Sequence, residues 1–420
     1  MTVEAKSRDR SRSQQRQANG HAHGTPTHLA SPRDFDGSLC PLIITGVWQL
    51  SSGHSDRVAE QLRTETITAL KAYAESGLWC FDCADIYTGV EALLGEVCSA
   101  TSIPMRFHTK CVPDLDVISD GKVTREYLEA GILRSAGRLR IDVVDLVQFH
   151  WWDYESPGFG EAFLQLCALL DTGLVRAVGL TNTDLPHLKE LVNMGGKVAS
   201  NQIQFSLLDR RPIESGMVSY CQENGIELLC YGVLAGGFLS ERWLGKDDPG
   251  FEGLENRSLT KYRLIIDEYG TWAEFQQLLR LLHELAQFHS TSIPAVATGW
   301  VLRQPARTRA ILGARGAAHV GGAAAGLEVS LSDADMKRLD TEVAGKGVKG
   351  EVFGVERAGG RHTGVMRRNL NGIASAAHVS ECLERARLAK KTGIAPKLLN
   401  REIELLQALG ADVSQLIDLQ

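Results

Sequence analysis

Short apolar runs alternate with longer amphipathic stretches from about residue 42 to residue 344 of the chain. Eight of the apolar runs have the pattern of buried strands. They span residues 42–50, 78–86, 106–111, 143–151, 175–181, 200–205, 226–233 and 309–312. The pattern therefore predicts eight strands separated by helices.

Two of the stretches between these runs show helical periodicity most plainly. Within residues 124–140 one face carries the recurring apolar residues Leu128, Ile132 and Leu139. A second helix is expected from residue 271 to about residue 289, and Thr271 and Glu274 form a capping box at its start. Its apolar stripe consists of Trp272, Phe275, Leu279, Leu282 and Ala286. Both patterns predict amphipathic helices with one face on a core.

Eight strand–helix repeats over about 300 residues are typical of an α/β fold, the parallel (β/α)8 TIM barrel. In that fold the functional site is built at the C-terminal ends of the strands. A doubly wound open sheet is the competing architecture, but it would carry a glycine-rich fingerprint after the first strand. Residues 45–49, Thr-Gly-Val-Trp-Gln, do not form one. We therefore expect a barrel over residues 39–345.

The segments on either side of the predicted barrel differ from it in composition. Residues 1–38 are polar and rich in Arg, Ser and Gln, without the apolar stretch of a secretory signal. We interpret them as a disordered tail, with an organellar transit peptide as the alternative. Residues 346–420 begin with a stretch rich in Gly and charge, which predicts a linker or a surface strap. Two amphipathic helices follow, at 376–391 and 396–409, and we expect them to dock on the barrel or on a partner chain.

Ionisable residues stand near the ends of three of the predicted strands. Asp82 lies in the second run and Tyr87 five residues later, while Lys110 lies in the third. His150 lies near the end of the fourth run, so parallel neighbouring strands would bring the four side chains together. A lysine beside a tyrosine lowers the tyrosine pKa, and an aspartate keeps the lysine charged. A histidine can hydrogen-bond a substrate carbonyl oxygen. This set predicts reduction of a carbonyl by hydride, with Tyr87 supplying the proton.

Composition and charge favour a soluble globular protein and argue against a membrane-spanning or nucleic-acid-binding one. The 420 residues are 44% hydrophobic and 23% charged, which is ordinary for a soluble globular protein. The net charge of −6 gives no reason to expect nucleic acid or an anionic membrane as partner, and no apolar run approaches the ~18 residues of a membrane span. Nine scattered cysteines favour a reduced, cytoplasmic compartment. Cys80 and Cys83 form a C-x-x-C pair that we interpret as packing thiols, and no metal site is predicted.

These motifs resemble those of the aldo-keto reductase superfamily over roughly residues 40–345. Residues 81–87 are similar to the family's Asp/Tyr motif. Thr109-Lys110 is similar to its lysine strand, and residues 145–150 are similar to its histidine strand. The resemblance implies that Tyr87 is the general acid and that Lys110 and Asp82 tune it. It also implies that His150 orients the substrate carbonyl.

Further segments resemble the family's NADP-binding positions. Residues 173–182 are similar to the segment whose Thr and Asn side chains hydrogen-bond the nicotinamide carboxamide, and Gln202 resembles the Gln that joins that contact. Residues 230–237 resemble the loop whose aromatic residue stacks on the nicotinamide ring. Residues 313–315 resemble the loop whose Arg meets the 2′-phosphate of NADP. The cofactor-binding residues implied are Gly46, Val47, Asp82, Thr181, Asn182, Gln202, Tyr231, Gly232, Leu234, Gly236, Gly313, Ala314, Arg315 and His319.

One position departs from the family pattern. Where relatives continue with Glu-Asn facing the adenine, this chain has Gly322-Ala323. We therefore expect NADP as the cofactor and keep NAD as a possibility.

Three tryptophans near the strand ends, Trp48, Trp151 and Trp152, are candidates for the wall of a substrate cleft. We interpret residues 240–269 as a long loop that folds over the cofactor as a flap. The sequence predicts an NADP-dependent oxidoreductase that reduces aldehydes or ketones, or oxidises alcohols or sugars in reverse. The alternative is an NADPH-binding regulatory subunit of a membrane or multiprotein complex with little turnover. The physiological substrate and the oligomeric state stay open.

Overall fold

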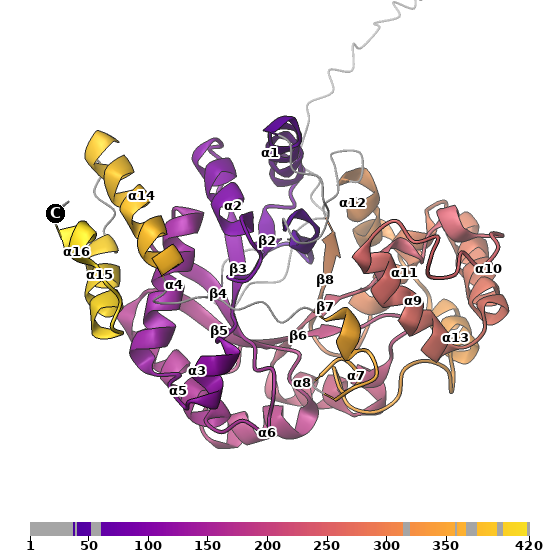
Figure 1. Cartoon of the computed structure of the whole chain (residues 1–420). Coiled ribbons are helices and arrows are strands. Elements are labelled where there is room, and N and C mark those ends of the chain that lie inside the picture. The colour runs from indigo at the N-terminus through magenta and orange to yellow at the C-terminus, as the bar shows by residue number, and fades with distance from the viewer. Residues whose placement is uncertain are drawn as a thin grey trace, which may run out of the picture.

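The predicted barrel is confirmed. The computed structural model describes residue 37 and residues 40–51, 60–313, 320–357, 359–366, 376–392 and 398–417. Eight parallel strands pair in sequence order, and the last pairs with the first, which closes the sheet (Figure 1). The strands are β1 (Ile43–Gly46), β2 (Cys80–Asp82), β3 (Arg106–Cys111), β4 (Val144–Phe149), β5 (Val175–Thr181), β6 (Ser200–Gln204), β7 (Glu227–Tyr231) and β8 (Thr308–Gly313). Each of the eight predicted runs overlaps one of them.

Helices surround the sheet (Figure 1). They are α1 (Glu60–Glu75), α2 (Val90–Ser99), α3 (Leu115–Ser119), α4 (Arg125–Leu139), α5 (Phe159–Ala168), α6 (Leu185–Asn193), α7 (Arg211–Glu214), α8 (Met217–Asn224), α9 (Arg257–Tyr269), α10 (Trp272–Phe288), α11 (Ile293–Leu302), α12 (Val320–Glu328) and α13 (Asp333–Glu342). Short 3-10 turns are η2 (Trp48–Leu50), η3 (Leu169–Thr172), η4 (Ala235–Gly237), η5 (Glu241–Trp243) and η7 (Thr363–Val365). The main hydrophobic core includes side chains of both strands and helices.

The two helices with the clearest sequence patterns are both present. The side chain of Thr124 caps α4 by accepting a hydrogen bond from the Tyr127 N–H. Thr271 and Glu274 form the expected capping box at the start of α10. The buried residues of the two stripes are Leu128, Ile132, Leu139, Phe275, Leu279, Leu282 and Ala286. The apolar face of each helix therefore packs inward as its periodicity predicts.

The segment after β7 is not the long loop that the sequence predicted. Residues 240–269 contain η5 and, from Arg257 onward, the three-turn helix α9. Asn256 caps this helix by accepting a hydrogen bond from the Leu259 N–H, a cap that the sequence analysis did not consider. The segment does reach the C-terminal end of the barrel, where Arg257 and Lys261 line the central cavity.

The C-terminal extension docks on the barrel of its own chain. Its helices are α14 (Ala376–Thr392), α15 (Leu399–Ala408) and α16 (Ser414–Ile417), and α14 and α15 lie beside α4 (Figure 1). Arg138 of α4 pairs with Glu381 at 2.6 Å, and Arg401 pairs with Glu129 of α4 at 2.9 Å. The sequence left open whether these helices dock on the barrel or on a partner chain. In the structure they dock on the barrel.

Of the two expectations for the stretch after the barrel, a linker or a surface strap, residues 346–357 and 359–366 agree with the strap. Arg211 lies in a buried ion pair with Glu356 of the strap at 2.9 Å and with Asp209 at 2.7 Å. Such a buried pair fixes geometry, because removing one partner leaves an uncompensated charge. The strap is thereby held against the barrel next to the strand ends.

The predicted tail, residues 1–38, lies outside the described residues except for residue 37. Among the helices that the structure describes, none is both long and apolar enough to cross a bilayer.

Candidate active site

The C-terminal ends of the strands surround a cavity of about 540 Å³. Asp82 ends β2, Lys110 is the penultimate residue of β3, and His150 directly follows β4. Tyr87 lies in the turn between β2 and α2, where its N–H donates to the Ala84 carbonyl. All four side chains line the cavity. The structure therefore brings together the four residues that the sequence singled out.

Asp82 and Lys110 form a buried ion pair. The Lys110 Nζ donates to Asp82 Oδ1 at 2.6 Å and to the Cys83 carbonyl at 2.8 Å. The other Asp82 oxygen accepts from the side-chain amides of Gln148 at 2.9 Å and Gln202 at 2.6 Å. Burial acts to lower the pKa of Lys110, but Asp82 outweighs it and raises that pKa above its ordinary value. Lys110 is thus a fixed positive charge.

Gln148 was missed by the sequence analysis. It lies in the predicted strand of residues 143–151, and the register places it beside Lys110 in the sheet. The available signal was an amide flanked by Val147 and Phe149 in a strand expected to be buried, since a buried amide needs a partner. Gln202 was assigned to the cofactor, and it does line the cavity. Its amide nitrogen, however, donates to Asp82 and Gln148.

Tyr87 carries a pKa opposite in direction to the expected one. Its ring is half-buried, and the Lys110 Nζ lies 5.1 Å from the ring centroid. Burial raises the pKa of Tyr87 above its ordinary value, and the nearby Lys110 charge offsets only part of that rise. Lys110 does act to lower the pKa of Tyr87, as expected, but burial, which the expectation left out, outweighs it. Tyr87 therefore holds its proton firmly at neutral pH.

His150 is buried and neutral. Its Nδ1 lies 3.1 Å from the Thr181 carbonyl oxygen, and since a carbonyl oxygen only accepts, Nδ1 is the nitrogen that bears the proton. Burial and the Arg357 charge lower the pKa of His150 to about 3. In this neutral form Nε2 is a hydrogen-bond acceptor. The imidazole can orient a hydroxyl through Nε2, whereas a carbonyl oxygen must take its hydrogen bond from another donor.

Most of the residues predicted to bind the cofactor line the same cavity. They are Gly46, Asp82, Thr181, Asn182, Gln202, Tyr231, Gly232, Leu234, Gly236 and Gly313. The Tyr231 hydroxyl donates to Asn182 Oδ1 at 2.8 Å, which fixes the plane of both side chains. Val47 is buried beneath the surface of the cavity and does not line it. Ala314, Arg315 and His319 lie outside the described residues.

Two glycines allow α9 to approach the loop after β7. Gly232 and Gly236 have φ values of 71° and 66°, a conformation that favours glycine. A Cβ on Gly232 would lie 2.6 Å from the Tyr262 hydroxyl oxygen, and one on Gly236 would lie 2.7 Å from the Tyr262 ring. Glycine at both positions therefore lets Tyr262 form part of the cavity wall.

The tryptophans divide into two groups. Trp48 and Trp152 line the cavity, and the Trp152 ring stands edge-on to His150 with 4.4 Å between centroids. Trp151 does not line it, so that prediction is wrong. Its ring packs against Phe149 at 5.7 Å and Phe159 at 6.0 Å in the core, because the side chains of successive residues point to opposite sides.

The strap supplies lining residues that the sequence analysis did not assign. Phe353, Val365 and Met366 line the cavity, and Phe353 stands edge-on to His150 at 5.8 Å. Arg357 donates to the carbonyls of Trp151 and Asn182, both at 2.6 Å. The available signal was the presence of isolated apolar residues in a segment otherwise rich in Gly and charge. The strap thus closes one side of the cavity and is held at the strand ends.

The chain matches a known protein family over most of its length. Residues 42–343 match the model of the Aldo/keto reductase family. Methylglyoxal reductase YeaE of Escherichia coli (strain K12) is 27% identical over 311 residues, which cover 73% of this chain and 92% of that protein. The NADH-specific methylglyoxal reductase of the same organism is 27% identical over 220 residues, 50% of this chain and 62% of that protein.

Solved structures show the same fold. An aldo/keto reductase from Klebsiella pneumoniae in complex with NADP and acetate has a TM-score of 0.56 at 20% identity, covering 74% of this chain and 94% of that one. The thermostable aldo-keto reductase Tm1743, in complex with the inhibitor epalrestat, has a TM-score of 0.58 at 24% identity, covering 73% and 96%.

Proposed function

Because the chain belongs to the aldo/keto reductase family, whose members are oxidoreductases, we propose that it reduces an aldehyde or ketone with NADPH and that Tyr87 is its acid. The observation that carries this proposal is the contact between a half-buried tyrosine and a buried Lys–Asp pair at the floor of a 540 Å³ cavity. The buried ion pair of Arg211 holds the strap, whereas the Lys110–Asp82 pair lines the cavity beside a tyrosine, where titratable groups can meet a substrate.

The cavity suits a nicotinamide cofactor. The aromatic ring of Tyr231 lines it. Thr181 at the end of β5 and Asn182, the next residue, line it too, and they carry a hydroxyl and an amide group. These groups would hold the nicotinamide end, while Gly232 and Gly236 keep the wall close. NADPH, when bound, supplies the hydride for reduction. NADP rather than NAD is proposed from the expected role of Arg315, and the NADH-specific relative is the reason to test both.

Tyr87 supplies the proton. With its pKa raised by burial, the phenol is protonated at neutral pH and can donate to a carbonyl oxygen as negative charge develops there. The phenolate left behind lies beside the Lys110 ammonium, which stabilises it. Asp82 keeps Lys110 charged and in place, and Gln148 and Gln202 hold Asp82. These contacts keep the Lys110 charge beside Tyr87, which lines the cavity.

His150 positions the substrate in this proposal. Its Nε2 accepts a hydrogen bond from a hydroxyl, which is the substrate alcohol in the direction of oxidation. In the direction of reduction Tyr87 alone donates to the carbonyl oxygen. A substrate with a hydroxyl next to its carbonyl group would use both side chains.

The lining favours a small aldehyde or ketone with an apolar or planar part. Trp48, Trp152 and Phe353 present aromatic surface around the polar floor. The names of the relatives point to small aldehydes too, since methylglyoxal reductases and a pyridoxal reductase of Arabidopsis thaliana are among them. We propose this class as the first to assay.

The regulatory-subunit alternative rested on the C-terminal extension. That extension pairs with α4 of the same chain through Arg138–Glu381 and Arg401–Glu129. The buried apolar residues of its helices pack with one another, and Leu405 of α15 joins the main core of the barrel. The enzyme is therefore the function that we propose.

The test is turnover of NADPH and of NADH by the purified full-length chain against methylglyoxal, pyridoxal and a set of aromatic aldehydes. We expect saturable oxidation with at least one aldehyde and a higher kcat/KM with NADPH than with NADH. Tight NADPH binding with no turnover on any carbonyl or alcohol would contradict the proposal and favour the regulatory function.

A further inference from the structure

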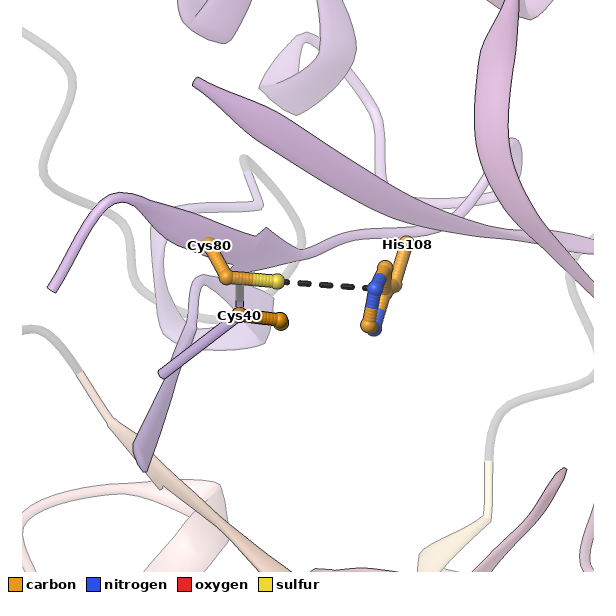
Figure 2. A group of neighbouring side chains, drawn as sticks. All are labelled: Cys40, Cys80 and His108. Carbon is orange, nitrogen blue, oxygen red and sulfur yellow. Dashed lines mark hydrogen bonds between the residues drawn. The ribbon is translucent and has the colours of Figure 1, made fainter. Parts of the chain in front are cut away.

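Two cysteines and a histidine meet inside the barrel, at the end opposite the proposed active site. Cys80 is the first residue of β2, whereas Asp82 is the last. His108 lies on β3 two residues before Lys110, so both point to the barrel interior. Cys40 precedes β1 and reaches the same place. Figure 2 shows the Cys80 thiol directed at the His108 imidazole with Cys40 next to it, and the ligand atoms of the three residues lie within 4.8 Å of one another.

The geometry is that of metal ligands. The Cys80 Sγ lies 3.5 Å from the His108 Nε2, and the two sulfurs and a ring nitrogen of the group all lie within 4.8 Å of one another. For Zn–S of about 2.3 Å and Zn–N of about 2.0 Å in a tetrahedron, the expected S···N and S···S separations are about 3.5 Å and about 3.8 Å. The Cys80–His108 separation equals that expected of two zinc ligands, and the Cys40 sulfur lies within 4.8 Å of both other ligand atoms.

The site is closed, and the charge pair next to it is that of Arg309, whose guanidinium donates to the Cys40 carbonyl at 2.6 Å and pairs with Glu227 at 3.0 Å. All three side chains are fully buried, and the residues packed with the two cysteines include Ile44, Leu146 and Leu229. Two thiolates balance the charge of one divalent cation, so the loaded site is neutral, as a buried position requires.

A second group of the same kind occurs between α14 and α15, and it differs in one respect. His378, Cys382 and Glu402 lie together there, but the Arg385 guanidinium donates to Glu402 at 2.5 Å and to the Cys382 sulfur at 3.2 Å. A guanidinium already provides the positive charge that a metal would bring. That group is therefore complete as an ion pair.

We propose that Cys40, Cys80 and His108 bind one zinc ion, which ties the segment before β1 to β2 and β3 at the base of the barrel. Binding releases two protons, one from each thiol, and the imidazole coordinates through Nε2 while Nδ1 keeps its proton. The three side chains occupy three positions of the tetrahedron. The role is structural, because the ion sits at the far end of the strands from Tyr87 and Lys110.

The test uses the full-length chain, reduced and freed of metal with a chelator, and then titrated with Co²⁺ under argon. Cobalt bound by cysteines gives a near-ultraviolet thiolate-to-metal charge-transfer band and visible bands of tetrahedral cobalt. Histidines of the N-terminal tail, such as His21 and His23, cannot produce the thiolate band. We expect the band to saturate at one cobalt per chain and to disappear on addition of one equivalent of zinc.

Three variants make the assignment specific. Cys80→Ser and His108→Gln should lose the thiolate band or weaken it strongly, while Cys221→Ser, which removes an equally buried thiol on α8, should keep it. Zinc should raise the unfolding midpoint of the wild type and of Cys221→Ser but not of Cys80→Ser. If the reduced wild type gives no thiolate band, or if Cys80→Ser binds as the wild type does, the proposal is wrong. Recovery of a Cys40–Cys80 disulfide in place of metal uptake under the same reducing conditions would also overturn it.

Discussion

Replacing Lys110 by methionine tests how the site controls the proton on Tyr87. The substitution removes a positive charge 5.1 Å from the centroid of the tyrosine ring and keeps most of the side-chain volume. At an effective dielectric constant of about 20, two unit charges at that distance interact by about 3 kcal/mol, equivalent to about two pKa units. This is an upper value, because Asp82 offsets part of the Lys110 charge.

The expected loss in kcat/KM for aldehyde reduction is on the order of 10²-fold, because the phenolate formed in the transition state loses that stabilisation. In the direction of alcohol oxidation, which needs Tyr87 deprotonated, the pH–rate profile should shift upward by up to about two units. Lys189→Met is the matched control. Its Nζ lies 5.3 Å from the Tyr220 ring centroid on the outside of the barrel, and neither quantity should change.

A double variant separates chemistry from stability. Lys110→Met alone leaves Asp82 buried with an unpaired charge, which destabilises the fold by about 3–5 kcal/mol in typical cases. Adding Asp82→Asn should restore most of that stability in urea unfolding, while activity stays low. An unshifted pH profile in Lys110→Met, or recovery of activity in the double variant, would refute the role given to Lys110.

Two further outcomes follow from the same structure. Trp152→Phe should raise KM for aldehydes, because Trp152 lines the cavity beside His150. Trp151→Phe should lower the free energy of unfolding and leave KM unchanged, because Trp151 packs in the core. The reverse result would contradict the positions of the two rings. His150 has a pKa of about 3 in the folded chain and an ordinary value of 6.5, so protons bind preferentially to the unfolded chain between those values. Stability should therefore fall as pH decreases from about 6.5 toward 3, and thermal melts of His150→Gln should show a smaller fall, which equal slopes for variant and wild type would contradict.

The strands, the main helices and the four polar residues at the strand ends were predictable, because each depends on the pattern of neighbouring residues in the sequence. Strand runs and the α10 capping box are readable from neighbouring residues, and parallel strands carry Asp82, Lys110 and His150 to one end of a barrel. A resemblance to a known family strengthened the same assignment, and the family match over residues 42–343 agrees with it.

What could not be predicted depends on contacts between distant segments. The pKa of Tyr87 is decided by how deeply the ring is buried, which no spacing reveals. Trp151 and Trp152 are adjacent in sequence, and only the exact end of β4 decides which of them faces the cavity. Phe353 reaches the site because a buried ion pair between Arg211 and Glu356 holds the strap, across 145 residues of sequence. The thiols of Cys40 and Cys80 meet because β1 pairs with β2, across 40 residues of sequence.

The most direct test of the central claim is the rate of NADPH oxidation by Tyr87→Phe, measured with the best aldehyde found for the wild type and with NADPH binding followed by fluorescence. The variant keeps the ring and loses only the hydroxyl. The account predicts unchanged NADPH affinity and a fall in kcat of about 10²–10⁴-fold, the usual range for a lost general acid. Wild-type turnover by Tyr87→Phe would show that another group supplies the proton, and the proposed mechanism would be wrong.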